Sequence, residues 1–182
     1  MEKARQRQPD AAADQGSAAG RPPAARSAGS LNALALRLLA QREHGRHELA
    51  RKLAARAESA EQLNAVLDRL QQGGLLSEQR FAEGLARRRA DRFGSLRIQQ
   101  EFQSLRVDAR FSGPVLAGLR HTERERALSA WRKRFGQPPR SLEERARQHR
   151  FLAGRGFAAD AIAWVLRHGA QQPPEADPSA AD

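Results

Sequence analysis

Residues 59–74 read SAEQLNAVLDRLQQGG, and this stretch decides the fold class. Its apolar residues recur at the i, i+3, i+4, i+7 spacing of one helix face: Leu63, Val66, Leu67 and Leu70. Ser59, followed three residues later by Gln62, forms a capping box and predicts the start of a helix. Gly73-Gly74 predicts its end, because glycine is the residue that most often closes a helix.

The apolar positions of this part of the chain return twice, at intervals of 49 and 50 residues. The three series are Leu53, Phe102 and Leu152; Val66, Val115 and Val165; and Leu67, Leu116 and Leu166. Short helical units that repeat in this way bury their apolar faces by stacking on one another. We therefore predict an all-α fold of three tandem three-helix repeats in an elongated, curved array. The predicted units are residues 31–76, 77–120 and 121–169.

Serine and threonine residues ahead of apolar runs predict further helix starts. The single N-cap candidates are Ser30, Ser77 and Ser95, and two more capping boxes are Thr122–Glu125 and Ser141–Glu144.

The two ends of the chain differ in composition from the middle. Residues 1–30 and 170–182 show no apolar periodicity, and we predict both to be disordered because neither can bury enough apolar surface to order itself. The chain has no cysteine, no apolar run long enough to span a bilayer and no signal peptide in its first residues. These features predict a cytoplasmic protein with no membrane segment.

The formal net charge is +11, and it belongs to the repeats. The two ends contribute +2 and −3, which leaves +12 on residues 31–169. A basic domain of this kind indicates a polyanionic partner, either nucleic acid, an acidic protein face or an anionic membrane. All but three of the 32 basic residues are arginine, which binds phosphate and carboxylate with two parallel hydrogen bonds. Genomic composition bias explains the same count equally well.

A series of short motifs runs through all three predicted units. It comprises residues 42–53 (REHGRHELARKL), 67–70 (LDRL), 74–82 (GLLSEQRFA), Gly94, Ile98, Glu101-Phe102, 150–152 (RFL) and 155–157 (RGF). In this order and spacing the series resembles the RecX family, whose members modulate the RecA recombinase. The resemblance covers residues 31–169.

The resemblance implies a fold and a function. It implies a protein of three tandem three-helix repeats that lies in the groove of the RecA–DNA filament. It implies a regulator that mainly inhibits the recombinase, ATPase and coprotease activities of RecA in DNA repair and the SOS response. We further predict a monomer that is not an enzyme and needs no cofactor, with weak self-association and weak direct binding to DNA left open.

The chain departs from the family pattern at three places. Arg106 stands where the family often has glycine, Gly94-Ser95 where it often has Gly-Pro, and Glu78 where it often has aspartate. These changes affect the expected local turn geometry.

Two basic runs supply the candidate contacts to a filament or to DNA. The candidate residues are Arg87, Arg88, Arg89, Arg92, Arg97, Arg124, Arg132, Lys133 and Arg134. A solvated face that pairs with neighbouring acids accounts for the same residues, since exposed arginines are common. On a helical wheel Arg89 falls within the apolar face, so it either packs against the core with a carboxylate partner or is aimed at a neighbouring unit or partner.

Signals for catalysis are absent from the sequence. No phosphate-cradling glycine motif occurs, and His44 and His47 are three residues apart without a further ligand, so we predict no catalytic, cofactor or metal site. Two other functions stay open on the sequence alone. One is a helical protein that binds DNA without sequence preference and without RecA, and the other is an adaptor for a different acidic protein.

Overall fold

The computed structural model describes residues 23–169 and 171, with side chains from residue 31 onward. Helices occupy most of this part, and no strand occurs within it. The helices are α1 (Pro23–Gln41), α2 (Arg46–Leu53), the short 3₁₀-helix η1 (Ala54–Arg56), α3 (Ala60–Gln72), α4 (Glu78–Ala90), α5 (Ser95–Ser104), α6 (Ala109–His121), α7 (Glu123–Arg134), α8 (Leu142–Gly154) and α9 (Ala159–His168). The prediction of disorder for residues 1–30 is wrong for residues 23–30, which belong to helix α1. The predicted disorder of residues 1–22, 170 and 172–182 lies outside the described residues.

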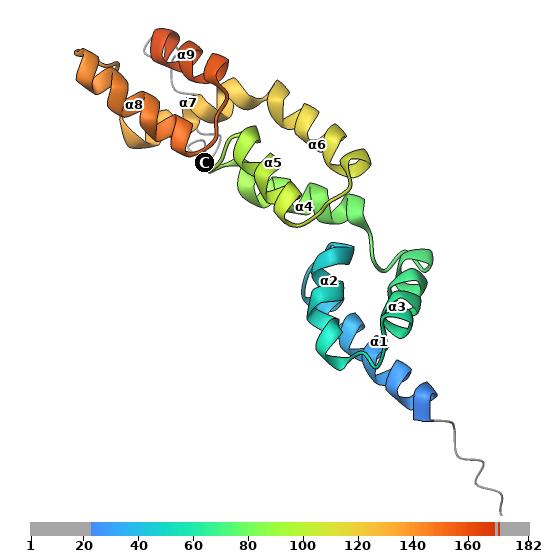
Figure 1. The fold of residues 1–182 in the computed structure, drawn as a ribbon. Helices are drawn as coiled ribbons and strands as arrows, with labels where there is room; N and C mark the ends of the chain where they lie inside the picture. The colour runs from blue at the N-terminus through green and yellow to red at the C-terminus, as the bar shows by residue number, and fades with distance from the viewer. Residues whose placement is uncertain (1–22, 170, 172–182) are drawn as a thin grey trace, which may run out of the picture.

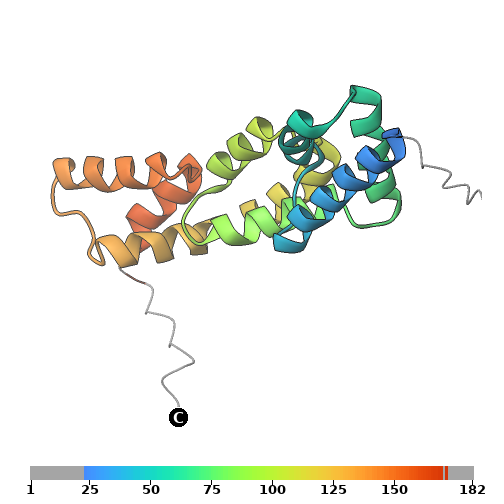
Figure 2. The same cartoon turned by 90° about the horizontal axis from the view of Figure 1, so that it is seen from below.

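The helices form three groups of three that follow one another along an elongated molecule (Figure 1). Helices α1–α3, α4–α6 and α7–α9 each pack among themselves, and the view from below shows the same row (Figure 2). We use unit 1, unit 2 and unit 3 for residues 31–76, 77–120 and 121–169. The predicted all-α array of three-helix repeats is confirmed.

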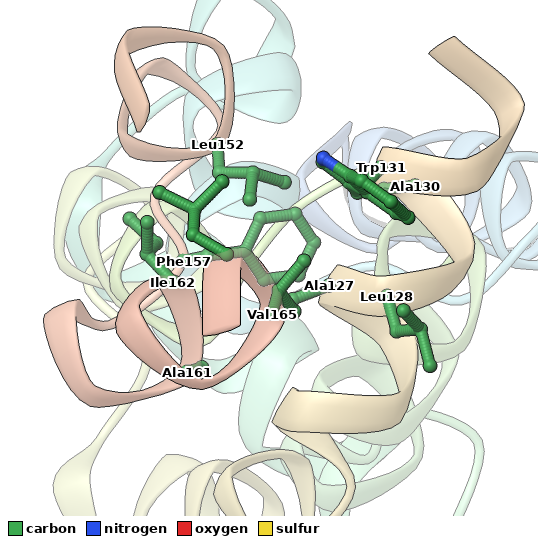
Figure 3. Packing of buried hydrophobic residues seen from close by; sticks show 10 residues of the cluster. Ala127, Leu128, Ala130, Trp131, Leu152, Phe157, Ala161, Ile162 and Val165 are labelled. Carbon is green, nitrogen blue, oxygen red and sulfur yellow. The ribbon is translucent and has the colours of Figure 1, made fainter. Parts of the chain in front are cut away.

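Each group of helices encloses a hydrophobic core of its own. Leu49, Val66 and Leu67 are central in the first, and Phe81, Ile98 and Phe102 in the second. In the third core, Trp131 of α7 faces Leu152 and Phe157 across a closely packed centre (Figure 3). Burial of such apolar side chains is the main favourable term, at about 25 cal/mol per Å². Three separate cores explain how a row of small units stays folded without a single large interior.

Several helix starts follow the serine signals. The hydroxyls of Ser59, Ser77 and Ser141 accept hydrogen bonds from the backbone N–H groups of Gln62, Arg80 and Glu144, respectively. The return bond of two predicted capping boxes reaches the residue before the cap. Glu58 N donates to Gln62 Oε1 over 2.9 Å, and Arg140 N donates to Glu144 Oε2 over 2.8 Å.

Three predicted caps are wrong. Helix α1 begins at Pro23, so Ser30 lies inside it, because proline is well suited to the first turn and the alanines that follow favour a helix. Thr122 makes no side-chain cap, and its hydroxyl donates to Leu119 O instead. Ser95 is the first residue of α5 rather than its N-cap, and Gly94 holds the cap position.

A carboxylate from unit 3 caps the start of α5 in unit 2. Glu123, only 3% exposed, accepts hydrogen bonds from Ser95 N at 2.9 Å and from the Ser95 hydroxyl at 2.7 Å. The same carboxylate accepts a bond of 3.1 Å from Ala158 N, at the start of α9. One buried acid therefore satisfies the N-termini of two helices in different units, where the helix dipoles also favour negative charge.

Backbone contacts close this junction between units 2 and 3. Gly94 N donates to Arg155 O over 2.9 Å, and Leu96 N donates to Gly156 O over 3.1 Å. A Cβ on Gly94 would lie 2.2 Å from Gly156 O, and one on Gly156 would lie 2.5 Å from Arg97 N. Gly156 also has a φ of +75°, so both steric space and backbone conformation require glycine there.

Replacement of Glu123 by alanine should lower the free energy of unfolding by about 2–4 kcal/mol, because it leaves buried donors at two helix starts without a partner. Glu125→Ala is the matched control, since Glu125 lies in the same first turn of α7 but is exposed. It should lose about 0.5 kcal/mol, the usual helix-dipole contribution. Urea denaturation measures the free energy of unfolding of both variants. Equal decreases would show that the buried carboxylate of Glu123 contributes no more than an exposed one.

Arg106 adopts the left-handed backbone conformation, with a φ of +55°. Its counterpart 50 residues later is Gly156, at a φ of +75°. Left-handed backbone costs a residue with a side chain roughly 1–2 kcal/mol, whereas glycine loses more chain entropy on folding. We expect Arg106→Gly to raise the free energy of unfolding by about 0.5–1 kcal/mol in thermal or urea denaturation. Gln103→Gly, in the exposed helical turn just before, should instead lower the free energy of unfolding by about 1 kcal/mol. A lower free energy of unfolding in both variants would contradict the inference that Arg106 is strained.

Candidate functional site

The first predicted basic run lies where α4 ends and α5 begins, in the middle of the molecule (Figure 1). Arg87, Arg88 and Arg89 occupy the last turn of α4, Arg92 follows it, and Arg97 lies in the first turn of α5. All except Arg89 are exposed. Because α4 and α5 pack against each other, the short loop between them brings these cations to one end of the helix pair.

Three of the guanidinium groups surround the ring of Phe93. The Cζ atoms of Arg89, Arg92 and Arg97 each lie 5.9 Å from the ring centroid, which is within cation–π range. The half-buried ring therefore gathers cations from two helices and the loop between them into one cluster. The sequence grouped these arginines by proximity, and the structure shows Phe93 as their common neighbour.

Arg89 has a carboxylate partner inside unit 2. Its Nη2 and Nε atoms donate to the same oxygen, Glu101 Oε1, over 2.8 and 3.2 Å. The two side chains are 43% and 26% exposed, so the pair is reached by solvent. A packed stem with a carboxylate partner was one of the two predicted roles of Arg89, and the other, contact with a partner molecule, stays a prediction.

Two neighbouring hollows share this ion pair. The first has a volume of about 320 Å³ and is lined by Phe93, Arg97, Gln100 and Ser104 as well as the pair. The second has about 360 Å³ and lies between units 1 and 2, with Arg42, Glu48, Phe81, Leu85, Arg88 and Leu105 around the pair. Together they form a basic groove, the name used below for the space lined by these residues.

The unit 1 side of the basic groove ends at a buried carboxylate. Both oxygens of Glu48 accept hydrogen bonds from Arg42, and Lys52 Nζ lies 3.5 Å from Glu48 Oε1. Burial raises the pKa of Glu48, but the bond from Arg42 and the neighbouring His44 outweigh it, so the pKa lies below its ordinary value. Glu48 is thus a charged, fully partnered anchor for Arg42.

His44 is 1% exposed and lies with Nδ1 3.2 Å from Glu48 Oε2. Burial lowers the pKa of His44 below its ordinary value of 6.5, with help from Arg42 and Lys52, although Glu48 acts in the opposite direction. In the part of the chain that the structure describes, no group of three or more His, Cys, Asp or Glu side chains is placed to hold a metal ion.

The second predicted basic run does not form one cluster. Arg124 lies in the first turn of α7, and Arg132, Lys133 and Arg134 lie in its last turn, about 12–15 Å further along the helix axis. Arg124 lies 3.7 Å from Asp160, and Arg134 lies 5.9 Å from the centroid of Phe135.

Two buried charges at the junction of units 2 and 3, Arg126 and Glu123, were not identified as structural residues from the sequence. Arg126 donates to the backbone oxygens of Ala90, Phe93 and Leu119, which are the carbonyls at the ends of α4 and α6. Burial lowers its pKa from the ordinary value. The sequence also did not indicate that Arg42 and Glu101 line the groove, because only the contact between units 1 and 2 brings them together.

The His44 site predicts a pH dependence. Because the pKa of His44 is lowered in the folded protein, the unfolded chain takes up its proton at a higher pH than the folded protein does. Stability is therefore full above the ordinary pKa of 6.5 and falls as the pH is lowered below it. The slope cannot exceed about 1.4 kcal/mol per pH unit for one proton. Glu48 adds a separate loss only below its ordinary pKa of 4.5.

Urea denaturation between pH 5 and 7 measures this dependence. His44→Gln should remove the slope whatever its effect on stability at pH 7. His149→Gln, at an exposed position on α8, should retain it. An unchanged slope in His44→Gln would assign the proton uptake to another group.

Comparisons with known proteins agree with the fold and the motif series. Two family models match, described as "RecX, third three-helix domain" over residues 122–166 and "RecX, first three-helix domain" over residues 33–70. "Regulatory protein RecX" of Leptothrix cholodnii is 51% identical over 138 residues, which are 76% of this chain and 88% of that protein. The protein of the same name from Ralstonia pickettii is 45% identical over 137 residues, covering 75% and 86%.

Among solved structures, the crystal structure of RecX from Lactobacillus salivarius superposes with a TM-score of 0.71 at 16% identity. The match covers 81% of this chain and 99% of that one. At this low sequence identity the superposition shows a similar fold and nothing about function.

Proposed function

Because the chain belongs to the RecX family of regulatory proteins, we propose that it binds the RecA nucleoprotein filament and modulates RecA. The effect is mainly inhibition of the recombinase, ATPase and coprotease activities in DNA repair and the SOS response. The protein acts by occupying the filament and performs no chemistry. The proposal places it in the cytoplasm as a monomer, and no helix in the described residues is long and apolar enough to cross a membrane.

The observation that carries this proposal is the identity of 51% across 88% of a protein named "Regulatory protein RecX". The shape and the charge support it. A row of three units offers separate contact surfaces to a long partner, and cations lie on α4, α5 and α7 in units 2 and 3. Weak contacts at several points of a rigid frame add up, because the frame holds them in place before binding.

The first experiment measures the DNA-dependent ATPase of RecA on single-stranded DNA, with this protein at far less than one copy per RecA subunit. We expect a progressive fall in the rate, as growth of the filament stops or subunits leave it. The variant with Arg88, Arg92 and Arg97 all changed to Gln should need about tenfold more protein for the same inhibition, a loss of about 1.4 kcal/mol in binding.

The matched control changes three exposed arginines of unit 1, Arg51, Arg56 and Arg69, to Gln. It removes the same net charge and should inhibit nearly as well as the natural protein. Equal weakening in both variants would mean that overall charge, not the basic groove, drives binding. No inhibition by folded natural protein at equimolar amounts would contradict the proposed function.

The basic groove also favours a second candidate, a helical protein that binds DNA without RecA and without sequence preference. The two functions differ in the partner required. Tight binding to bare DNA that does not strengthen on a RecA filament would favour the second, whereas weak, salt-sensitive binding that strengthens on the filament favours the first.

A further inference from the structure

The two junctions of the array are built on one plan but close differently. At both, the first residue of a unit's first helix caps the middle helix of the unit before it: Glu123 accepts a hydrogen bond from Ser95 N, and Glu78 accepts one from Arg46 N. At the junction of units 2 and 3, the loop of Arg155 and Gly156 then bonds to the start of α5. At the other junction, the described residues show no such backbone bond from Leu105 or Arg106 to unit 1.

Arg106 accounts for part of this difference. Its counterpart Gly156 approaches the neighbouring helix so closely that a Cβ would lie 2.5 Å from Arg97 N. A residue with a side chain does not fit such an approach. In the described residues the loop of unit 2 makes no backbone hydrogen bond to unit 1, and a hollow of about 360 Å³ lies between the two units.

The charges around this opening are unevenly paired. Glu48 is matched by Arg42 and Lys52, and Glu101 is matched by Arg89. Arg88 and Arg97 line the same groove, while Arg92 lies at its edge beside Phe93. The groove thus presents a row of cations from unit 1 to the start of α5, with an aromatic ring among them.

We propose that the basic groove binds the phosphodiester backbone of a DNA strand, and that Glu101 holds the place of one phosphate in the free protein. On binding, Arg89 exchanges the Glu101 carboxylate for a phosphate group. This inference rests on the proposed function, and it names the part of the nucleoprotein filament that the groove contacts.

The geometry of Arg89 suits such an exchange. Both of its bonds fall on one carboxylate oxygen, Glu101 Oε1, and the pair is open to solvent, where ion pairs are weak. A guanidinium also binds phosphate with two parallel bonds, so a phosphate replaces the carboxylate without loss of hydrogen bonds.

The spread of the cations favours a linear polyanion over a single carboxylate. They line two adjoining hollows on unit 1, α4 and α5, as the spaced charges of a backbone require. Sites for single strands commonly combine such a positive groove with aromatic side chains and arginine, and Phe93 supplies the ring.

The test measures binding of fluorescent oligo(dT) to the full chain by anisotropy over a series of salt concentrations. Glu101→Gln should tighten binding severalfold and steepen the plot of log K against log salt by about 0.7, the value for one more phosphate on a single strand. The matched control is Glu83→Gln, which adds the same charge on α4, where Glu83 accepts a bond from Gln79. It should leave the slope unchanged. Arg97→Gln should lower the slope by about 0.7.

Two results would overturn the inference. Equal tightening by Glu101→Gln and Glu83→Gln would show an effect of net charge alone. If Glu101→Gln bound the RecA filament more tightly but bound oligo(dT) with unchanged affinity, the groove would bind protein carboxylates instead of phosphate. In either case RecA ATPase inhibition by the natural protein would still stand as an independent test of the proposed function. Thermal melting of each variant verifies that it is folded.

Discussion

The array depends on a carboxylate that is buried where two helices begin. An isolated acid at 3% exposure would be costly, but Glu123 lies among backbone N–H groups that have no partner within their own helices. Its three bonds tie α5 of unit 2 and α9 of unit 3 to the first residue of α7. The relative position of two units is therefore fixed at one point, and Arg126 secures the same junction from the carbonyl ends of α4 and α6.

The same device recurs at the first junction through Glu78 and the start of α2. In unit 3 the middle helix α8 has its own cap instead, from the Ser141 hydroxyl and the Glu144 side chain. Whether a middle helix is capped from within or from a following unit thus distinguishes the last unit from the first two. These polar contacts join neighbouring units, whereas each hydrophobic core lies within one unit.

Sequence patterns predicted the parts of the fold that are local. The i, i+3, i+4 spacing in residues 59–74 and the serines at 59, 77 and 141 act within one helix, so each could be read directly. The errors at Ser95 and Thr122 have a different cause. Ser95 resembles an N-cap, but a carboxylate 28 residues away takes that role, and no local rule indicates so distant a partner. The prediction of Ser30 as an N-cap was wrong because a proline earlier in the chain can also begin a helix.

The candidate site shows the same limit more strongly. The wheel placed Arg89 on the apolar face and left its partner open, and only the packing of α5 on α4 brings Glu101 to it. The open groove between units 1 and 2 lies beside a turn where Arg106 has the same left-handed backbone as Gly156, so the two turns differ in their side chains and not in their backbone conformation. Arginine in place of glycine costs local strain. At the second junction, Gly156 lies so close to Arg97 that a side chain would not fit. A strained residue beside the candidate site is consistent with selection for an open groove rather than for maximum stability, since strain of this kind persists where the surrounding structure and function sustain it.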